Sequence, residues 1–249
     1  MIPYIRRKKV LELLHAKELV YLDELVDYTG VSLATVRRDL KLFEEEGQVE
    51  LLQGGAARIR VNVSERNIKE KLTLNRDMKE IVAGYAATLV NDGQFIYVGP
   101  GTTENWMFAN LGGKNITVVT NGVHHIEKLM ENKINSQLLG GELLNNIAVV
   151  VGYDAIKQIE QMNFDKCFIG ASGFTLEQGA STSESGVAEI NRVAMRRSQK
   201  SYLLLDSTKI GVNSKYTFAA PEEFDTIIVA GEIEQKYLDL ENIYSVEMN

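Results

Sequence analysis

The chain has 249 residues, 45% of them hydrophobic, and a formal net charge of −7 at pH 7, which suits one large domain or a small domain followed by a medium one. A single cysteine, Cys167, excludes a disulfide framework and a metal site built from several cysteines. The N-terminus shows no signal-peptide pattern and no segment approaches the ~20 apolar residues of a membrane span, so we expect a soluble cytoplasmic protein.

Charge is unevenly distributed along the chain. Residues 1–60 contain ten Lys or Arg and ten Asp or Glu, and subtracting these from the totals of 27 and 34 leaves 17 and 24 for the remainder. The first sixty residues are therefore neutral. A nucleic-acid-binding face there must come from the arrangement of side chains, since net charge does not supply one.

The apolar spacing predicts three helices in the first sixty residues. The first runs from Tyr4 to His15, a short extended piece follows over 18–22, and the second helix ends at Gly30. Ser32 is a good N-cap for the third helix, which Gly47 closes. The inward stripe of this third helix consists of Leu33, Val36, Leu40 and Phe43.

A β-hairpin is predicted after the third helix. Its strands, Gln48–Leu52 and Ala57–Val61, flank the turn residues Gly54 and Gly55. Two short helices, a serine-capped basic helix and a hairpin, in this order, indicate a winged helix-turn-helix over residues 1–60.

The outward side of the third helix carries residue types that read DNA. Arginine binds guanine with two hydrogen bonds, the methyl groups of alanine and threonine suit the thymine methyl, and a serine at a helix N-terminus suits phosphate. The residues expected on this side are Ser32, Ala34, Thr35, Arg37, Arg38 and Lys41. The alternative is that the two arginines are solvated and pair with Asp39 or with the run Glu44–Glu46; the order of elements favours DNA binding.

These residues also carry a resemblance. The segment "VSLATVRRDLKLFEEEG" followed by "QGGA" resembles the N-terminal signature of the DeoR family of bacterial transcriptional regulators. The match departs from the family pattern at Leu51, where many members have arginine, and at Gln53, where many have histidine. Wing contacts to the DNA backbone would then fall to Arg58 and Arg60.

The remainder of the chain predicts a connecting segment and an α/β domain. Residues 61–79 are polar, with weak helical spacing, and we interpret them as a partly helical linker. Over residues 80–249 apolar strands alternate with helices, which indicates a parallel sheet covered on both faces. The expected strands are Phe95–Val98, Ile116–Thr120, Gln137–Leu139, Lys166–Ile169, Tyr202–Leu205 and Thr226–Ala230. The expected helices include Glu104–Leu111, Val123–Asn132, Asp154–Met162 and Val187–Ser198.

Small-residue turns follow most of these strands and are expected at one edge of the sheet, where ligands bind. In the first turn the amides and hydroxyls of Gly101, Thr102 and Thr103 could surround an anion. Lys209 could add a positive charge and Asp206 could accept a hydrogen bond from a hydroxyl. Glycines that merely turn the chain are the alternative, which we prefer for Gly140-Gly141 taken alone.

Two nucleotide-binding motifs are excluded at the first turn. A dinucleotide fingerprint needs a third glycine at the position of Glu104, whose carboxylate would repel pyrophosphate. No Gly-Lys-Ser/Thr follows, so a Walker P-loop is absent.

The second half resembles the DeoR family as well. The family's Gly-Thr-Thr, Thr-Asn, Gly-Gly and Asp-Ser-Thr-Lys elements match positions in this sequence, with Gly99-Pro100 in place of the usual Asp-Ser. The resemblance implies a Rossmann-like domain related to ribose-5-phosphate isomerase and glucosamine-6-phosphate deaminase, with a site for a phosphorylated sugar. The site residues carried over are Gly101, Thr102, Thr103, Thr120, Asn121, Gly140, Gly141, Asp206 and Lys209.

Other chemistry-bearing residues give weaker signals. His124 and His125 follow a strand end, so one of them could reach the crevice, but without a partner cluster we prefer a surface position at a helix N-terminus. Cys167 is expected to pack inside a strand, and Trp106 against its own helix. Glu184 lies in a serine-rich loop, "STSESG", that could act as a lid or simply be mobile.

The resulting hypothesis is a DNA-binding repressor of a carbohydrate-catabolism operon. A phosphorylated sugar would modulate its affinity for operator DNA, and it would act as a dimer or higher homo-oligomer, because paired half-sites need paired recognition helices. No cofactor, metal or catalytic residue is expected. The alternative is a sugar-phosphate isomerase- or deaminase-like enzyme fused to a DNA-binding module, with Asp206 or Glu184 as general base and Lys209 as electrostatic stabiliser.

Overall fold

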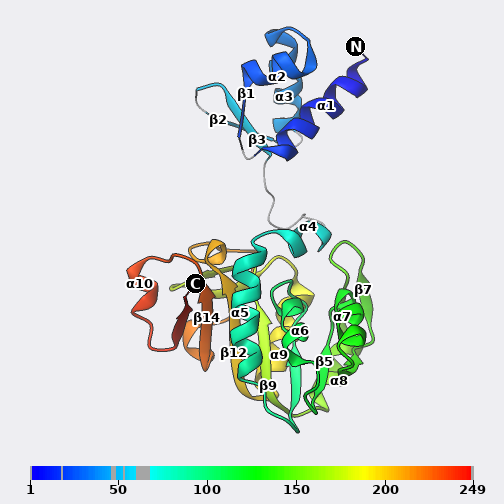
Figure 1. Ribbon diagram of the computed structural model, residues 1–249, viewed down its shortest axis with the longest axis vertical. Coiled ribbons are helices and arrows are strands. Elements are labelled where there is room, and N and C mark those ends of the chain that lie inside the picture. Colours follow the sequence, from blue (N-terminus) through cyan, green and yellow to red (C-terminus); the bar gives the residue numbers. More distant parts are fainter. Residues whose placement is uncertain (1, 18, 46–48, 53, 60–67, 248–249) are drawn as a thin grey trace. The chain divides into compact units, whose positions relative to one another are not determined.

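The computed structural model describes residues 2–17, 19–45, 49–52, 54–59 and 68–247. It divides into two compact units, Met1–Glu65 and Arg66–Asn249 (Figure 1). Each unit has its own hydrophobic core, so the two are described separately.

The N-terminal unit contains the three helices that the apolar spacing predicts. They are α1 (Pro3–Ala16), α2 (Leu22–Thr29) and α3 (Leu33–Glu45). Gly30 ends α2 in the left-handed region at φ 68°, and its N–H donates to the carbonyl of Val26. Ser32 opens α3, where its carbonyl and its hydroxyl both accept from the N–H of Thr35, at 2.9 and 3.4 Å.

A three-stranded sheet completes this unit. The strands are β1 (Val20–Tyr21), β2 (Val49–Leu52) and β3 (Ala56–Ile59), and their order β1-β3-β2 places the early extended piece beside the hairpin. Gly54 and Gly55 form the hairpin turn at φ 93° and 78°, values that favour glycine. The outer ends of the two predicted strands, at Gln48 and at 60–61, lie outside the described residues, as does Gln53. The winged helix-turn-helix prediction is confirmed.

The second unit is built on a seven-stranded sheet in the order β15-β14-β12-β9-β4-β5-β6, in which every neighbouring pair is parallel. Its strands are β4 (Phe95–Val98), β5 (Thr117–Thr120), β6 (Asn135–Leu138), β9 (Phe164–Gly170), β12 (Ser198–Asp206), β14 (Thr226–Ala230) and β15 (Ile243–Val246). Six of them are the predicted strands. The sequence reading missed β15, whose edge position leaves it only partly buried.

The period of two along each strand decides which face a side chain joins. Ile96 and Val98 of β4 pack on one face with α5 (Arg76–Thr88) and α6 (Phe108–Leu111). Tyr97 joins the other face with α8 (Tyr153–Glu160) and α9 (Ser185–Arg196). The sheet is thus covered on both sides, as predicted for a Rossmann-like domain.

Helix boundaries differ from the prediction near the carboxyl ends of β4 and β5. The segment 104–111 is a 3-10 turn, η1 (Glu104–Trp106), followed by α6, and the segment 123–132 is η2 (Val123–His125) followed by α7 (Ile126–Glu131). Helix α4 (Ile68–Thr73) and the start of α5 lie within 61–79. The remaining short helices are η3 (Ser207–Lys209), η4 (Pro221–Glu223) and α10 (Gln235–Leu238).

Small antiparallel strands were not predicted. They are β7 (Glu142–Leu144) with β8 (Val149–Val151), and β10 (Gly173–Thr175), β11 (Gly179–Thr182) and β13 (Tyr216–Ala219) in one sheet. The interpretation of "STSESG" as a lid or mobile loop is wrong, because Ser181 and Thr182 are buried in β11 and Ser185 begins α9. In the described part of the chain, no helix has the length and apolar character needed to cross a bilayer.

Candidate functional site

Helix α3 presents its basic side chains to solvent. Ser32, Ala34, Arg37, Arg38 and Lys41 are exposed, and Thr35 is half-buried. Val36, Leu40 and Phe43 anchor the opposite side in the core, which leaves the candidate DNA-contacting residues no room to turn inward. The outer side of α3 is therefore free to enter a major groove.

The pairing of these arginines with Asp39 is wrong as an alternative. Asp39 is fully buried, and its carboxylate accepts from Arg6, at 2.5 and 3.0 Å, and from Arg7, at 3.2 Å. Burial alone would raise the pKa of Asp39, but the hydrogen bonds and charges of the two α1 arginines outweigh it and lower that pKa. Among the described residues, no ion pair engages Arg37, Arg38 or Lys41.

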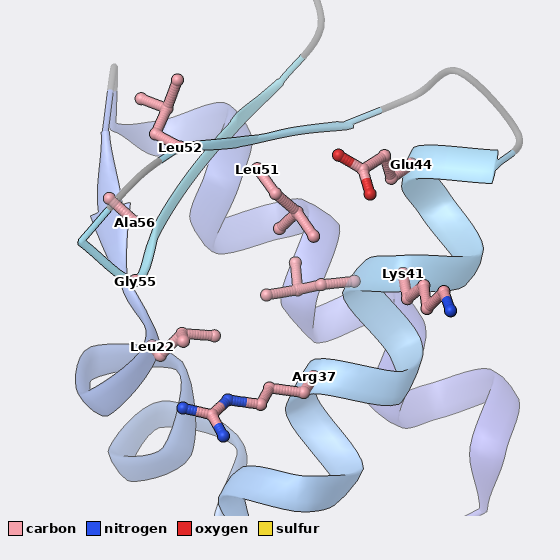
Figure 2. A pocket seen from close by; sticks show the side chains of 9 residues that line it. Leu22, Arg37, Lys41, Glu44, Leu51, Leu52, Gly55 and Ala56 are labelled. Atoms are coloured by element: carbon pink, nitrogen blue, oxygen red, sulfur yellow. The ribbon is translucent and has the colours of Figure 1, made fainter.

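On the wing, Arg58 already has a partner within the unit. Arg58 of β3 forms an ion pair with Glu50 of β2 at 2.8 Å. An exposed ion pair of this kind contributes at most ~1 kcal/mol, so a DNA phosphate could replace Glu50 as the partner of Arg58. Arg60 lies outside the described residues. Leu51 is exposed and lines a groove of about 310 Å³ between α3 and the hairpin, which Figure 2 shows from close by.

The second unit gathers its turns at the carboxyl edge of the parallel sheet. From β4 the chain goes on to β5 and β6 on one side and later adds β9 on the other, so the topological switch point lies between β4 and β9. At such a point the turns after the strands open a crevice for ligands. The loops of Gly99 and Gly170 meet there, with the Gly99 N–H donating to Phe168 at 2.8 Å.

Glu104 occupies this switch point. Its buried carboxylate accepts from the N–H of Gly170 at 2.5 Å and lies against Gly101, where an added Cβ would overlap it. Burial raises the pKa of Glu104 to about 7, against the hydrogen bonds from backbone N–H groups. Glu104 was expected to repel a pyrophosphate from the ligand side of the turn. Instead, its carboxyl group is buried under the turn, where it fills the space beside Gly101 and binds the Gly170 N–H.

Thr120 and Asn121 shape the loops from inside. Both are fully buried, and Asn121 accepts from the Tyr97 hydroxyl at 2.8 Å and donates to the carbonyl of Val150 at 2.9 Å. The Thr120 hydroxyl lies 3.0 Å from Nδ1 of His125, whose Nε2 lies 3.1 Å from the carbonyl of Gly101. The surface position expected for the histidines is wrong for His125, which joins two predicted site elements.

His124 is also withdrawn from the surface. Its ring nitrogens are buried and have no hydrogen bond among the described residues, although the carbonyls of Ala148 and Gly101 lie nearby. Burial lowers the pKa of His124 to about 4 and takes that of His125 well below its ordinary value. Both imidazoles are therefore neutral at physiological pH.

The remaining predicted residues fall into two groups. Gly140 and Gly141 are exposed, and Gln158 of α8 holds Gly140 through its N–H and its carbonyl, at 3.1 and 3.0 Å. Gly101 and Thr102 are half-buried, whereas Thr103 is buried. The loop offers fewer free hydroxyls to an anion than the sequence suggested.

Sequence reasoning missed two residues that the fold brings to Asp206. The Asn75 amide donates to Asp206 and to Thr208, each at 3.1 Å, and Lys79 of α5 is buried close enough to Asp206 and Glu104 for their charges to act on it. Burial lowers the pKa of Lys79 to about 8, although Asp206 works against this shift. The local sequence carried no signal for this contact, because Asn75 and Lys79 lie in the segment interpreted as a linker, far along the chain from Asp206.

Two acids of this group keep oxygens that have no partner in the part of the chain that the structure describes. One carboxylate oxygen each of Asp206 and Glu104 is buried with no hydrogen-bond partner among the described residues. The half-buried Lys209 supplies a second ammonium group, which lowers the pKa of Lys79 further. This arrangement can hold a phosphate and a hydroxyl. Within the described ranges, no group of three His, Cys, Asp or Glu could hold a metal ion.

The fold and these sites define a class of protein: a winged helix-turn-helix DNA-binding unit followed by a Rossmann-like unit with polar groups at its switch point. Residues 6–61 match the model of the DeoR-like helix-turn-helix domain, and residues 74–230 match that of the DeoR C terminal sensor domain. The chain belongs to the DeoR family of transcriptional regulators.

Curated relatives are similar over nearly the whole chain. The uncharacterized HTH-type transcriptional regulator FruR of Bacillus subtilis is 32% identical over 94% of this chain and 93% of its own. GolR of Listeria innocua, an HTH-type transcriptional regulator, is 32% identical over 94% and 92%, and the lactose phosphotransferase system repressor of Staphylococcus epidermidis is 29% identical over 98% of both. These names confirm a regulator over the enzyme alternative.

Proposed function

We propose that this protein represses an operon of carbohydrate catabolism, with residues 1–60 binding operator DNA and residues 80–249 binding a phosphorylated sugar or related metabolite. The observation that carries the proposal is the outer side of α3. There, Arg37, Arg38 and Lys41 are exposed and unpaired among the described residues, while the acid that follows the two arginines, Asp39, is buried against α1. Relatives that are named repressors support repression of the operon over its activation.

The effector class follows from the groups at the switch point. Lys79 and Lys209 suit a phosphate, and the unpartnered oxygen of Asp206 suits a sugar hydroxyl. We further propose that the protein acts in the cytoplasm as a homodimer or tetramer, since a two-fold operator requires two recognition helices.

A mobility-shift titration on the DNA upstream of its own operon tests the DNA-binding part. Arg38→Ala should weaken binding roughly 5- to 150-fold, because a bidentate arginine–guanine pair contributes about 1–3 kcal/mol of discrimination. Unchanged affinity in a folded Arg38→Ala variant would contradict the assignment. The effector part is tested by a thermal-shift screen of pentose and hexose phosphates against the matching unphosphorylated sugars.

A further inference from the structure

The groove between α3 and the hairpin is the strongest feature that the proposed function leaves unused. Its walls are aliphatic, and three ionisable side chains of α3 stand at its rim (Figure 2). The lining residues are Leu22, Arg37, Leu40, Lys41, Glu44, Leu51, Leu52, Gly55 and Ala56.

The groove separates the two adjacent arginines. Successive helical residues are ~100° apart around the axis. Arg37 is followed at helical spacing by Lys41 and Glu44, all three lining the groove, and Figure 2 shows Arg37 reaching toward Leu22. Arg38 is exposed but does not line the groove, and it shares its side of the helix with Ala34. The two guanidinium groups therefore face different surroundings.

We propose, on the basis of the proposed DNA binding, that this groove receives the sugar-phosphate backbone of one DNA strand. Arg37 holds a phosphate, the deoxyribose lies against Leu51, and Arg38 is left to read base edges. Aliphatic walls suit the C–H surface of deoxyribose, and two cations with no ion pair among the described residues suit a phosphate. Lys41 lines the groove and is also exposed on the outer side of α3. The groove and the outer side of α3 therefore adjoin at Lys41 and can contact the same DNA strand.

Glu44 gives the proposal its sharpest consequence. It has no ion pair among the described residues, and Figure 2 shows its carboxylate turned toward the hairpin, beside Leu51. A phosphate in the groove would lie near a like charge, which opposes binding. Removing the charge of Glu44 should therefore strengthen DNA binding, whereas removing that of Arg37 should weaken it.

The test measures fluorescence anisotropy of the full chain on two duplexes over a salt series. One is the upstream duplex that the wild-type protein shifts, and the other is a mixed-sequence duplex of the same length. Arg37→Gln should weaken both by a similar factor, roughly tenfold at low salt, and should reduce the salt slope by about one. Glu44→Gln should strengthen both several-fold. Arg38→Gln should reduce mainly the difference between the two duplexes.

Glu12→Gln on α1 is the matched control for Glu44→Gln, because it removes one negative charge at an exposed position outside the groove, where Glu12 has, among the described residues, only a long ion pair with Lys8, at 3.9 Å. Its affinity for each duplex should stay within about twofold of the wild-type value. This result would show that the effect of Glu44→Gln comes from the groove and not from the change in the protein's net charge. Circular dichroism checks that each variant is folded.

Two results would overturn the groove assignment while leaving DNA binding intact. In the first, both Arg37→Gln and Glu44→Gln bind the mixed-sequence duplex as tightly as the wild-type protein does. In the second, Arg37→Gln weakens binding to the upstream duplex alone, which would make Arg37 a base-reading residue. If the wild-type protein discriminates no upstream duplex from the mixed one, the proposed function itself fails, and the assignment falls with it.

Discussion

At the scale of single residues, Asp39 explains how a recognition helix can contain an acid without losing its basic outer side. The carboxylate lies inside the unit and binds two arginines of α1, so it stabilises the packing of α1 on α3. Arg37 and Arg38 stay available because Asp39 is occupied elsewhere. The same sequence, "RRD", therefore serves the interior and the surface at once.

Asp39→Asn should destabilise the N-terminal unit by about 1 kcal/mol, because Arg6 and Arg7 lose the charge of the carboxylate that they bind but keep access to water. The folded-state pKa of Asp39 is below its unfolded value, so the stabilisation is present above pH ~4 and is lost as the pH falls through the folded value. Urea unfolding at pH 7 measures the loss, with Arg38→Ala as the surface control. Equal stability of Asp39→Asn and wild type would contradict this role.

Lys79 should make ligand binding at the proposed effector site depend on pH. With its pKa lowered to about 8, the ammonium loses its proton as the pH rises from 7 to 9, while a phosphate monoester, whose second pKa is ~6, stays dianionic. Affinity for a phosphorylated sugar should therefore fall over this range. Isothermal titration at pH 7, 8 and 9 measures it. In Lys79→Met the binding should be weak and nearly independent of pH; a wild-type affinity constant from pH 7 to 9 would rule out a charge contact with Lys79.

At the scale of elements, the turn after β4 depends on a glycine for space. A methyl group at Gly101 would overlap the carboxylate of Glu104, which in turn holds the turn after β9. The turns of two strands are thus fitted to each other at the switch point.

Gly101→Ala should displace the buried Glu104 carboxylate, lower the melting temperature and weaken effector binding, since the carboxylate must give up its place against Gly101 and its hydrogen bond from Gly170. Gly84→Ala in α5 is the matched control: an added Cβ meets nothing within 4 Å there, so the change should stabilise the helix by about 0.5–1 kcal/mol. Differential scanning calorimetry compares the two. Full effector binding by Gly101→Ala would show that the loop adapts without cost.

At the scale of the whole molecule, the proposed effector site includes residues of the segment that leads back along the chain to the N-terminal unit. Asn75 at the start of α5 donates to Asp206, and the Lys79 ammonium donates to the carbonyl of Lys71 in α4. A ligand that competes for Asp206 and Lys79 would change these bonds. Coupling between the sites requires that the ligand bind the two states of this segment unequally.

Asp206→Asn should keep ligand-free affinity for DNA and lose the response to a phosphorylated sugar. The amide still offers an oxygen to Asn75 and Thr208, but it removes the charge beside Lys79. Anisotropy titrations of the upstream duplex, with and without the sugar phosphate found by screening, measure the response. A full response in Asp206→Asn would place the coupling elsewhere.

By itself, the sequence determined the elements and the class of each unit. Helix periodicity, Gly30, Ser32 and the Gly54-Gly55 turn specify the winged unit locally, and the buried strands are short apolar runs because both their faces are covered. Edge and antiparallel strands such as β15 and β11 escaped prediction, since half-exposed or small-residue strands have no such run.

Only the tertiary structure decided which side chains share a site. It buried His125 between Thr120 and Gly101, sent Asp39 to α1, and brought Asn75 and Lys79 to Asp206 across more than a hundred residues. Local spacing does not encode such meetings, because they depend on strand order and on which helix covers which face. The elements follow from the chain's own pattern, whereas the sites follow from the packing of one element on another.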